Sequence, residues 1–392
     1  MQGLFPMKDF EFYFPTKIVF GKNVLKKLEE DLPNYGKKVL LIYGKASLIK
    51  SGFYEKLHTF FSKKGLFCIE FGGIKPNPPL GQVLAGIEVA RKEKPDFLLA
   101  VGGGSVIDAA KAIACGYYYG EAIWDFFERK GFPDKALPVI TLPTIAGTGS
   151  EANDVSVIVN EKKGLKLSLR SPMLFPKAAY LDPTLTMTVP KNYTFYGIMD
   201  AFSHLFEFFH FRLDKDSGFP EDYIILLMKT LLKAGYKLLE NPNDYAARSE
   251  IMWVSTLALS PVVRAGLGAY RFFLHSLEHP LSGLFDTPHG LGLSILMRAY
   301  LKRFATHSIV RNFFQKVFEI PEESNLSKKG LKYFDKLLDE FEIPKTLKAL
   351  DIPKDSLPQL IEKACEILYI WKAEKEFSPH IVKEIYELAY DN

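Results

Sequence analysis

Two short windows of the chain hold most of the side chains that could bind a metal ion. Asp200 and His204 are spaced i, i+4, so their side chains share one face if the segment is a helix. His275, His279 and His289 follow in a second window. One carboxylate with several imidazoles is a mixed oxygen and nitrogen donor set that suits iron, zinc or manganese. We therefore expect a divalent metal site.

A plain structural role is the alternative for both windows. An Asp/His pair at i, i+4 is often only a surface or core hydrogen bond. The second window, however, mixes its histidines with Leu, Phe and Pro and is apolar enough to be buried. Because buried imidazoles need polar partners, this window favours a metal site.

The composition limits the classes of protein to which the chain can belong. Its 392 residues, 47% of them hydrophobic, are enough for two domains with sizeable cores. Lys+Arg 50 against Asp+Glu 46 leaves a net charge of +4, and the two signs are interspersed, which argues against a nucleic-acid or membrane-surface partner. Cys68, Cys115 and Cys365 are far apart and form no Cys-x-x-Cys, which indicates a reducing compartment. With no signal-like segment and no apolar run of membrane length, a soluble cytoplasmic protein is expected.

Residues 1–187 alternate short apolar runs with helical patterns. This alternation is typical of a parallel sheet wound with helices. Strands are predicted at 38–43, 67–71, 97–101 and 137–142, and helices at 52–64 and 80–94.

Residues 188–392 have no comparable strand signals. Their periodicity predicts an all-α domain, so we place the domain boundary between residues 187 and 188. Helices are predicted at 196–209, 223–239, 246–260, 293–304, 308–318 and 356–369.

Two loops of the first half have features of phosphate-binding segments. The run Gly102-Gly103-Gly104-Ser105 joins a predicted strand to a helical pattern that contains Asp108. Glycines let backbone N–H groups approach a phosphate, and the helix N-terminus adds partial positive charge. This is not the G-x-G-x-x-G motif, and close packing alone is the alternative explanation for a Gly-rich turn.

The second loop, residues 142–151, is rich in glycine and hydroxyl side chains, among them Thr144 and Thr148. It follows another predicted strand of the same wound sheet. Because ligands of such sheets bind at the carboxyl ends of the strands, the two loops together favour a dinucleotide.

These features together resemble the iron-containing (group III) alcohol dehydrogenase family over nearly the whole chain. Residues 14–21, FPTKIVFG, are similar to its first strand, Pro76-Asn77-Pro78 to its loop near the cofactor, and residues 102–108 to its diphosphate-binding turn. The resemblance implies an α/β N-terminal dinucleotide-binding domain with a wound parallel sheet. It also implies an all-α C-terminal metal-binding domain, the dehydroquinate synthase-like architecture.

The resemblance assigns roles within the two histidine windows. His279 would be an active-site histidine that relays a proton without coordinating the metal, and a core histidine is the alternative. Iron is the expected metal, with zinc and manganese as alternatives. The implied metal ligands are Asp200, His204, His275 and His289.

The residues that follow the strand at 38–43 bear on the choice of nicotinamide cofactor. They read Gly44-Lys45-Ala46-Ser47, at the place where NAD-preferring folds present a carboxylate to the ribose 2′-hydroxyl. Glycine leaves room for the 2′-phosphate of NADP, Ser47 can donate a hydrogen bond and Lys45 can supply charge. We therefore predict NADP, with NAD and a simple turn as the alternatives.

A lysine completes the expected cofactor site. Lys166, which follows a hairpin predicted at residues 155–160, resembles the family lysine that reaches the cofactor ribose, and a solvated lysine is the alternative. The full set of expected cofactor-binding residues is Gly44, Ser47, Asn77, Gly103, Gly104, Ser105, Asp108, Thr144, Thr148 and Lys166.

The implied function is a metal-dependent oxidoreductase, acting as a homodimer, that interconverts a primary alcohol and its aldehyde by hydride transfer with NAD(P)(H) while the metal polarises the substrate oxygen. Thr144-Ile145 and Glu151-Ala152-Asn153 are most similar to the NADPH-dependent butanol dehydrogenase and aldehyde reductase branch. The Phe-rich segments 202–211 and 264–273 would line the substrate side. The alternatives are a dehydroquinate synthase-like lyase, a glycerol-type polyol dehydrogenase of the same fold, and a cofactor-binding protein without catalysis.

Overall fold

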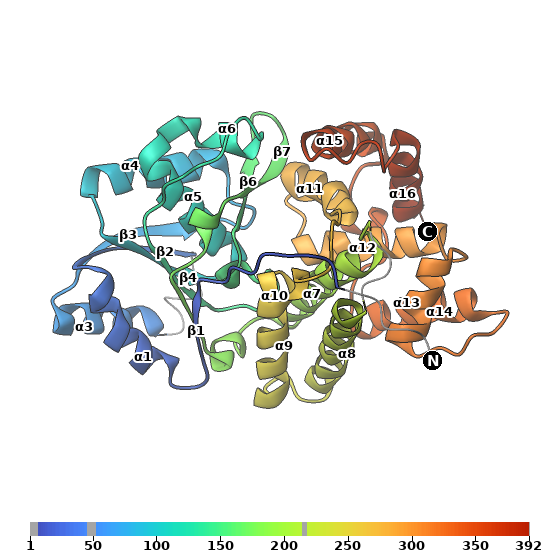
Figure 1. The fold of residues 1–392 in the computed structure, drawn as a ribbon, viewed down its shortest axis with the longest axis horizontal. Helices are drawn as coiled ribbons and strands as arrows, with labels where there is room; N and C mark the ends of the chain where they lie inside the picture. Colours follow the sequence, from blue (N-terminus) through green and yellow to red (C-terminus); the bar gives the residue numbers. More distant parts are fainter. Residues whose placement is uncertain (1–6, 45–51, 214–217, 392) are drawn as a thin grey trace. The chain divides into compact units, whose positions relative to one another are not determined.

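The chain folds into two compact units (Figure 1). A computed structural model describes residues 7–44, 52–213 and 218–391. Residues Phe14–Val189 form the first unit, and residues 190–391 form the second together with residues 7–13. The N–H of Lys8 donates to the carbonyl of Gly266 at 3.1 Å and so ties the N-terminal segment to the second unit. Lys45 and Ser47, on which part of the NADP prediction rests, lie outside the described residues.

A six-stranded parallel sheet forms the centre of the first unit, within the described residues, which confirms the predicted wound sheet. Three of its four inner strands are buried at every position, as expected for a parallel sheet covered on both faces. In spatial order the strands are β1 (Lys17–Phe20), β8 (Ala178–Leu181), β5 (Val139–Pro143), β4 (Phe97–Gly102), β2 (Lys38–Gly44) and β3 (Phe67–Ile74).

Helices cover both faces of this sheet (Figure 1). Apolar side chains of α1 and α3 form one core with alternate residues of β2, β4, β5 and β8. The helices are α1 (Val24–Asp31), α3 (Phe53–Lys64), α4 (Leu80–Glu93), α5 (Gly104–Tyr119) and α6 (Ile123–Phe127).

The strand order creates a switch point between β2 and β4. From β2 the chain runs outward to β3 and then returns to β4 on the other side of β2. Doubly wound sheets bind ligands at the carboxyl ends of the strands beside such a point. Gly44 ends β2 and Gly102 ends β4, so both predicted cofactor segments begin there.

An antiparallel hairpin lies outside the main sheet. Strand β6 (Val155–Asn160) pairs with β7 (Leu165–Arg170), and Lys166 lies opposite Val159. The prediction that Lys166 follows a hairpin at residues 155–160 is therefore wrong, because that range is only the first strand and Lys166 belongs to the second. Gly164, with a φ of 61°, permits the turn between the two strands.

The second unit is helical, as predicted, but its described residues contain four helices that the periodicity did not indicate: α10, α11, α14 and α16. Helix α11 includes Pro280, a residue that normally interrupts a helix. The helices are α7 (Lys191–His210), α8 (Phe219–Glu240), α9 (Tyr245–Ala258), α10 (Pro261–Arg264), α11 (Phe273–Phe285), α12 (His289–Arg303), α13 (Ser308–Phe318), α14 (Leu326–Glu340), α15 (Leu357–Ile370) and α16 (Pro379–Asp391).

Helix α7 is buried at every position from Ile198 to His210. Phe202, Phe206, Phe208 and Phe209 are fully buried, and the Phe206 ring lies 4.9 Å from that of Phe313 on α13. The Phe-rich stretch of α7 therefore builds the core of the unit, contrary to the expectation that it lines the substrate side.

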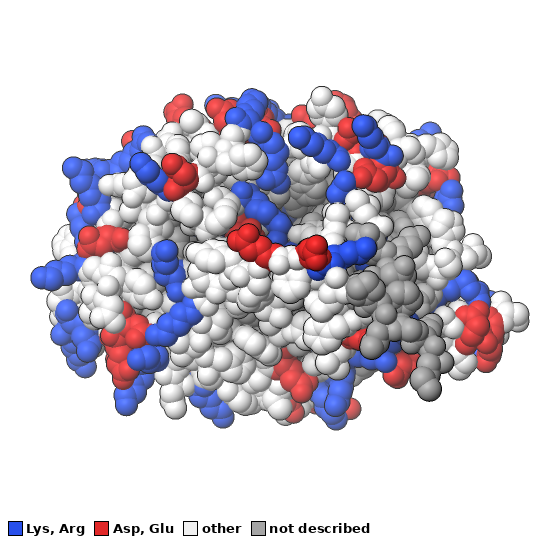
Figure 2. Space-filling model, in the orientation of Figure 1, with Lys and Arg blue, Asp and Glu red and all other residues white. Residues whose placement is uncertain are grey.

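The C-terminal helix is tied to α11, because the hydroxyl of Tyr386 on α16 donates to the carbonyl of Leu277. Among the described residues, no helix has the length and apolar character needed to cross a membrane. On the face drawn in Figure 2, basic and acidic side chains are interspersed, in agreement with the charge balance of the sequence.

Candidate metal and cofactor sites

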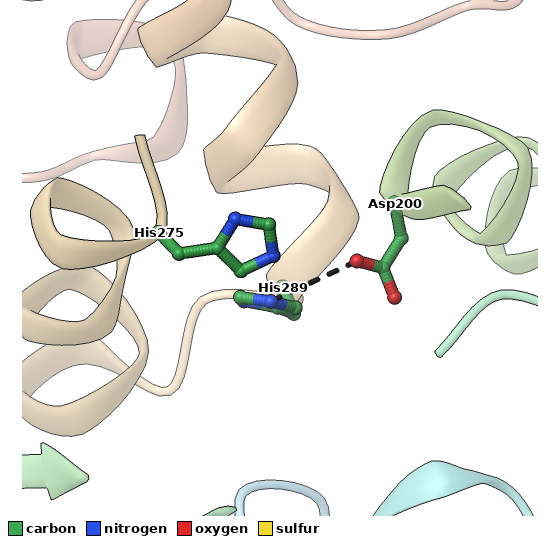
Figure 3. Close-up of side chains that lie close together, drawn as sticks. All are labelled: Asp200, His275 and His289. Carbon is green, nitrogen blue, oxygen red and sulfur yellow. Dashed lines mark ion pairs between the residues drawn. The ribbon is translucent and has the colours of Figure 1, made fainter. Parts of the chain in front are cut away.

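Three helices of the second unit bring together three of the predicted metal ligands. Asp200 comes from α7, His275 from the first turn of α11, and His289 is the first residue of α12. Each offers a ligand atom within 4.8 Å of the other two. Asp200 Oδ1 lies 3.7 Å from His289 Nε2, and the His275 ring points toward the same place (Figure 3).

His204 lies beside this group. Its position on α7 confirms the i, i+4 relation to Asp200, and its Nδ1 is 3.7 Å from Asp200 Oδ1. Its ring stacks on that of His275, with 4.6 Å between centroids. Among the described residues, the group with mutual distances within 4.8 Å does not include His204. Burial, followed by the nearby His275, holds the pKa of His204 well below its usual value, so its ring is neutral and retains a lone pair.

Two buried glutamates that the sequence reading did not single out hold two of these histidines. Glu207 accepts a hydrogen bond from Nδ1 of His275, and Glu278 accepts one from Nδ1 of His289. With Nδ1 engaged in this way, Nε2 is the nitrogen of each ring that can bind a metal. Carboxylates of this kind fix the orientation of metal-binding histidines and raise their basicity. The donor set therefore fits a divalent metal.

The sequence carried a signal for both glutamates. Each stands three residues after a predicted site histidine, Glu207 after His204 and Glu278 after His275, and each lies in a run of Phe and Leu. A buried carboxylate needs hydrogen-bond partners, so its presence in such a run indicates a pairing. Burial raises the pKa of Glu207 well above its usual range, and hydrogen bonds from the N–H groups of Leu274 and His275 act in the opposite direction.

His279 lies close to the metal-ligand group on α11. It is buried, its ring centroid is 5.8 Å from that of His289, and the ring of Trp371 packs against it in a T-shaped arrangement with 5.2 Å between centroids. Glu278, His279 and His289 form a second group whose ligand atoms lie within 4.8 Å of one another.

In the first unit, the two predicted phosphate loops lie at the ends of neighbouring strands and pack together. The N–H of Thr144 donates to the carbonyl of Gly102 at 3.0 Å. A Cβ at Gly103 would lie 2.6 Å from Ile145 Cγ2, and one at Gly104 would lie 2.4 Å from Thr148 Cγ2. The absence of side chains at these glycines therefore lets the second loop lie directly on the turn. Ser105 follows in the first turn of α5.

Two hydrogen bonds join further predicted cofactor residues to their neighbours. Ser150 Oγ donates to Asp108 Oδ1 at 2.6 Å, and Lys166 Nζ donates to Asn77 Oδ1 at 3.0 Å. Burial raises the pKa of Asp108 to about 6, although the nearby Lys111 ammonium lowers it in part. The structure thus places Asn77 and Lys166 in contact although they lie far apart in the sequence.

Comparisons with known proteins agree with this architecture. Residues 15–183 match the family described as iron-containing alcohol dehydrogenase, and residues 194–390 match the C-terminal domain of the same family. The probable NADH-dependent butanol dehydrogenase 1 of Bacillus subtilis (strain 168) is 35% identical over 365 residues, which cover 91% of this chain and 94% of the relative. The NADPH-dependent aldehyde reductase YqhD of Escherichia coli (strain K12) is 30% identical over 98% of this chain and 100% of its own.

A solved structure extends the likeness to three dimensions. The crystal structure of NADH-dependent butanol dehydrogenase A from Thermotoga maritima has a TM-score of 0.91 and 35% identity, and the alignment covers 99% of this chain and 100% of the other. The predicted fold class and oxidoreductase class are confirmed by these matches. The chain belongs to the iron-containing alcohol dehydrogenase family.

Proposed function

We propose that the group formed by Asp200, His275 and His289 holds the catalytic metal of a dehydrogenase for primary alcohols and aldehydes. The observation that carries this proposal is the pair of histidines whose Nδ1 atoms are held by buried carboxylates, which leaves both Nε2 atoms for one cation. His204, in van der Waals contact with the His275 ring, is proposed as the fourth ligand, and iron as the metal.

A bound divalent cation supplies Lewis-acid polarisation of the substrate oxygen, and a nicotinamide carries the hydride. The residues of this chain orient these groups and move the proton. His279 is proposed to relay that proton, because its ring centroid lies 5.8 Å from that of His289 and an imidazole can both accept and donate a proton. The ring of Trp371 packs against it at an interplanar angle of 82° and restricts its orientation.

The cofactor site is proposed at the switch point of the sheet. Backbone N–H groups at the start of α5 would bind the diphosphate, and the Asn77–Lys166 pair would bind a ribose. The proposed cofactor residues that the structure describes are Gly44, Asn77, Gly103, Gly104, Ser105, Asp108, Thr144, Thr148 and Lys166.

One assay tests the whole proposal. The purified protein is screened against short aldehydes with NADH and NADPH, before and after chelation and after iron, zinc or manganese is restored. We expect reduction of an aldehyde that is lost on chelation and recovered with one of the metals. Failure to oxidise or reduce any short alcohol or aldehyde with metal present would instead indicate cofactor binding without catalysis.

The choice between NADP(H) and NAD(H) is proposed to depend on Gly44, and we expect the wild type to prefer NADPH. A Cβ at this position would lie 3.9 Å from both Ile74 O and Val106 Cγ2, which is an ordinary contact distance, so the Cβ of a larger side chain can be accommodated. Gly44→Asp should move the kcat/KM ratio toward NADH by about tenfold, equivalent to ~1.4 kcal/mol, because a carboxylate repels the 2′-phosphate.

Gly44→Ala is the matched control for this change, because it adds the Cβ without the charge. It should leave the cofactor ratio close to that of the wild type. The relatives carry names of both kinds, NADH-dependent and NADPH-dependent, so kcat/KM has to be measured with each cofactor. A wild type that already favours NADH several-fold would refute the argument from Gly44.

A further inference from the structure

Glu207 on α7 contacts both the start of helix α11 and the imidazole of His275. Its Oε1 accepts the N–H of Leu274 at 2.6 Å and lies 3.4 Å from the N–H of His275, while its Oε2 accepts from Nδ1 of the His275 ring. These two amides belong to the first turn of α11, whose N–H groups have no partner within their own helix. Phe272, which precedes the helix, has no polar side chain to cap it. One buried carboxylate thus caps α11 and holds the first ligand on that helix.

We infer that Glu207 is a positioning residue that sets the ring tautomer of His275. The N–H groups of Leu274 and His275 point at Oε1 and favour the ionised form of Glu207, in which both oxygens are acceptors, so the hydrogen bond at Oε2 requires the ring proton on Nδ1. The lone pair of His275 is then on Nε2, on the side of Asp200 and His289. The inference rests on the proposed metal site and adds to it the reason why this ring is ready to bind a cation.

Both contacts of Glu207 are with N–H groups, so each of its two oxygens must accept a hydrogen bond. A glutamine of the same shape has one oxygen and one amide NH₂. If its oxygen caps α11, the NH₂ faces His275 and donates to Nδ1, and the ring proton moves to Nε2, where it blocks metal binding. The opposite orientation sets the NH₂ against the N–H of Leu274, which leaves buried donors without an acceptor and costs about 1–3 kcal/mol.

Glu278 offers a contrast to Glu207, because its second oxygen is hydrogen-bonded to a hydroxyl group and not to a backbone N–H. Its Oε2 accepts from Nδ1 of His289, and its Oε1 bonds to Ser282 Oγ. Ser282 Oγ also lies 3.0 Å from the carbonyl of Thr287. A hydroxyl can accept from an amide while it donates to that carbonyl, so a glutamine at position 278 keeps its oxygen for His289 and preserves the tautomer of that ring.

A comparison of the matched variants Glu207→Gln and Glu278→Gln therefore distinguishes the effect of the ring tautomer from the effect of the lost carboxylate charge. Both remove one buried negative charge beside a metal-binding histidine. Only Glu207→Gln is expected to move the proton of the imidazole that it contacts from Nδ1 to Nε2. A difference between the two variants cannot arise from the lost charge alone.

The experiment reads the imidazole ¹⁵N resonances of the metal-free wild type and both variants, with the His275 signals assigned by comparison with His275→Ala. We expect His275 to carry its proton on Nδ1 in the wild type and in Glu278→Gln, and on Nε2 in Glu207→Gln. Affinity for Zn²⁺ alone, measured by chelator competition, should fall at least about tenfold further in Glu207→Gln than in Glu278→Gln, as expected for loss of such a partner.

The position of the ring proton on His275 tests the inference about Glu207. A wild-type His275 with its proton on Nε2, or a Glu207→Gln variant whose ring keeps the proton on Nδ1, would overturn it. Should Glu207→Gln not fold, the wild-type spectrum still gives this answer. A wild type that binds no Zn²⁺ while its His275 carries the proton on Nδ1 would contradict the proposed metal site and leave the role of Glu207 intact.

Discussion

His275→Ala is expected to reduce turnover by about 10²–10³-fold or more and to weaken metal binding, while the affinity for the nicotinamide cofactor largely survives. A Lewis acid supplies several kcal/mol of stabilisation in the transition state, and the variant lacks one of the atoms proposed to hold it. Glu207 would also lose its ring partner in a fully buried position. Asp200→Ala should have the same effect, because Asp200 provides the carboxylate of the group.

The separation of the two effects follows from the two units. The proposed ligands lie in the helical unit, and the phosphate loops lie in the α/β unit. Metal content by elemental analysis and cofactor affinity by fluorescence titration measure them independently. His380→Ala, on an exposed face of α16, is the control and should keep both metal and turnover. A loss of cofactor affinity as large as the loss of metal in His275→Ala would contradict this division.

Gly103→Val is expected to raise the KM for the cofactor by about 10–100-fold, with bound metal unchanged. Each hydrogen bond to a charged group contributes about 1.5–3 kcal/mol, and a side chain at this position keeps the diphosphate from the backbone N–H groups. The same side chain would meet Ile145, whose Cγ2 lies 2.6 Å from the position of the new Cβ, and displace the second loop. Asp108→Ala, which removes the bond to Ser150, should act in the same direction.

Gly81→Val is the control for Gly103→Val. Position 81 is exposed on α4, and a Cβ there would lie 3.8 Å from its nearest neighbour, Glu161 Oε2, so the backbone need not move. Its KM for the cofactor should stay close to the wild-type value. An unaltered cofactor affinity in Gly103→Val would mean that the turn serves only the packing of the two loops.

Much of the α/β unit could be predicted because its strands are continuous apolar runs. The segments 97–101 and 137–142 lie within or overlap β4 and β5, which are buried at every position. Strand β8 was missed, since its four residues, AAYL, are too few to give a period and contain two alanines. Helix α11 was missed because Pro280 normally interrupts a helix.

The candidate metal group was predictable from residue type, since carboxylate and imidazole side chains are rare in apolar windows. The role of Glu207 was not, because it depends on α7 lying against the start of α11, which no local pattern encodes. The same holds for the Asn77–Lys166 contact between a loop and the hairpin. The prediction also gave His204 the same standing as the other ligands, whereas its ring stacks beside the group.

The bond between Tyr386 and Leu277 has a consequence for the order in which the protein matures. The helix that carries His275 and His279 is tied to α16 by two residues that lie 109 positions apart in the sequence, so α16 is synthesised well after α11. Chains fold from the N-terminus as they are synthesised, so the whole sheet of the α/β unit is available while the helical unit is still incomplete. The packing around α11 can be completed only after α16 has been synthesised, so we expect the proposed metal site to form later than the sheet.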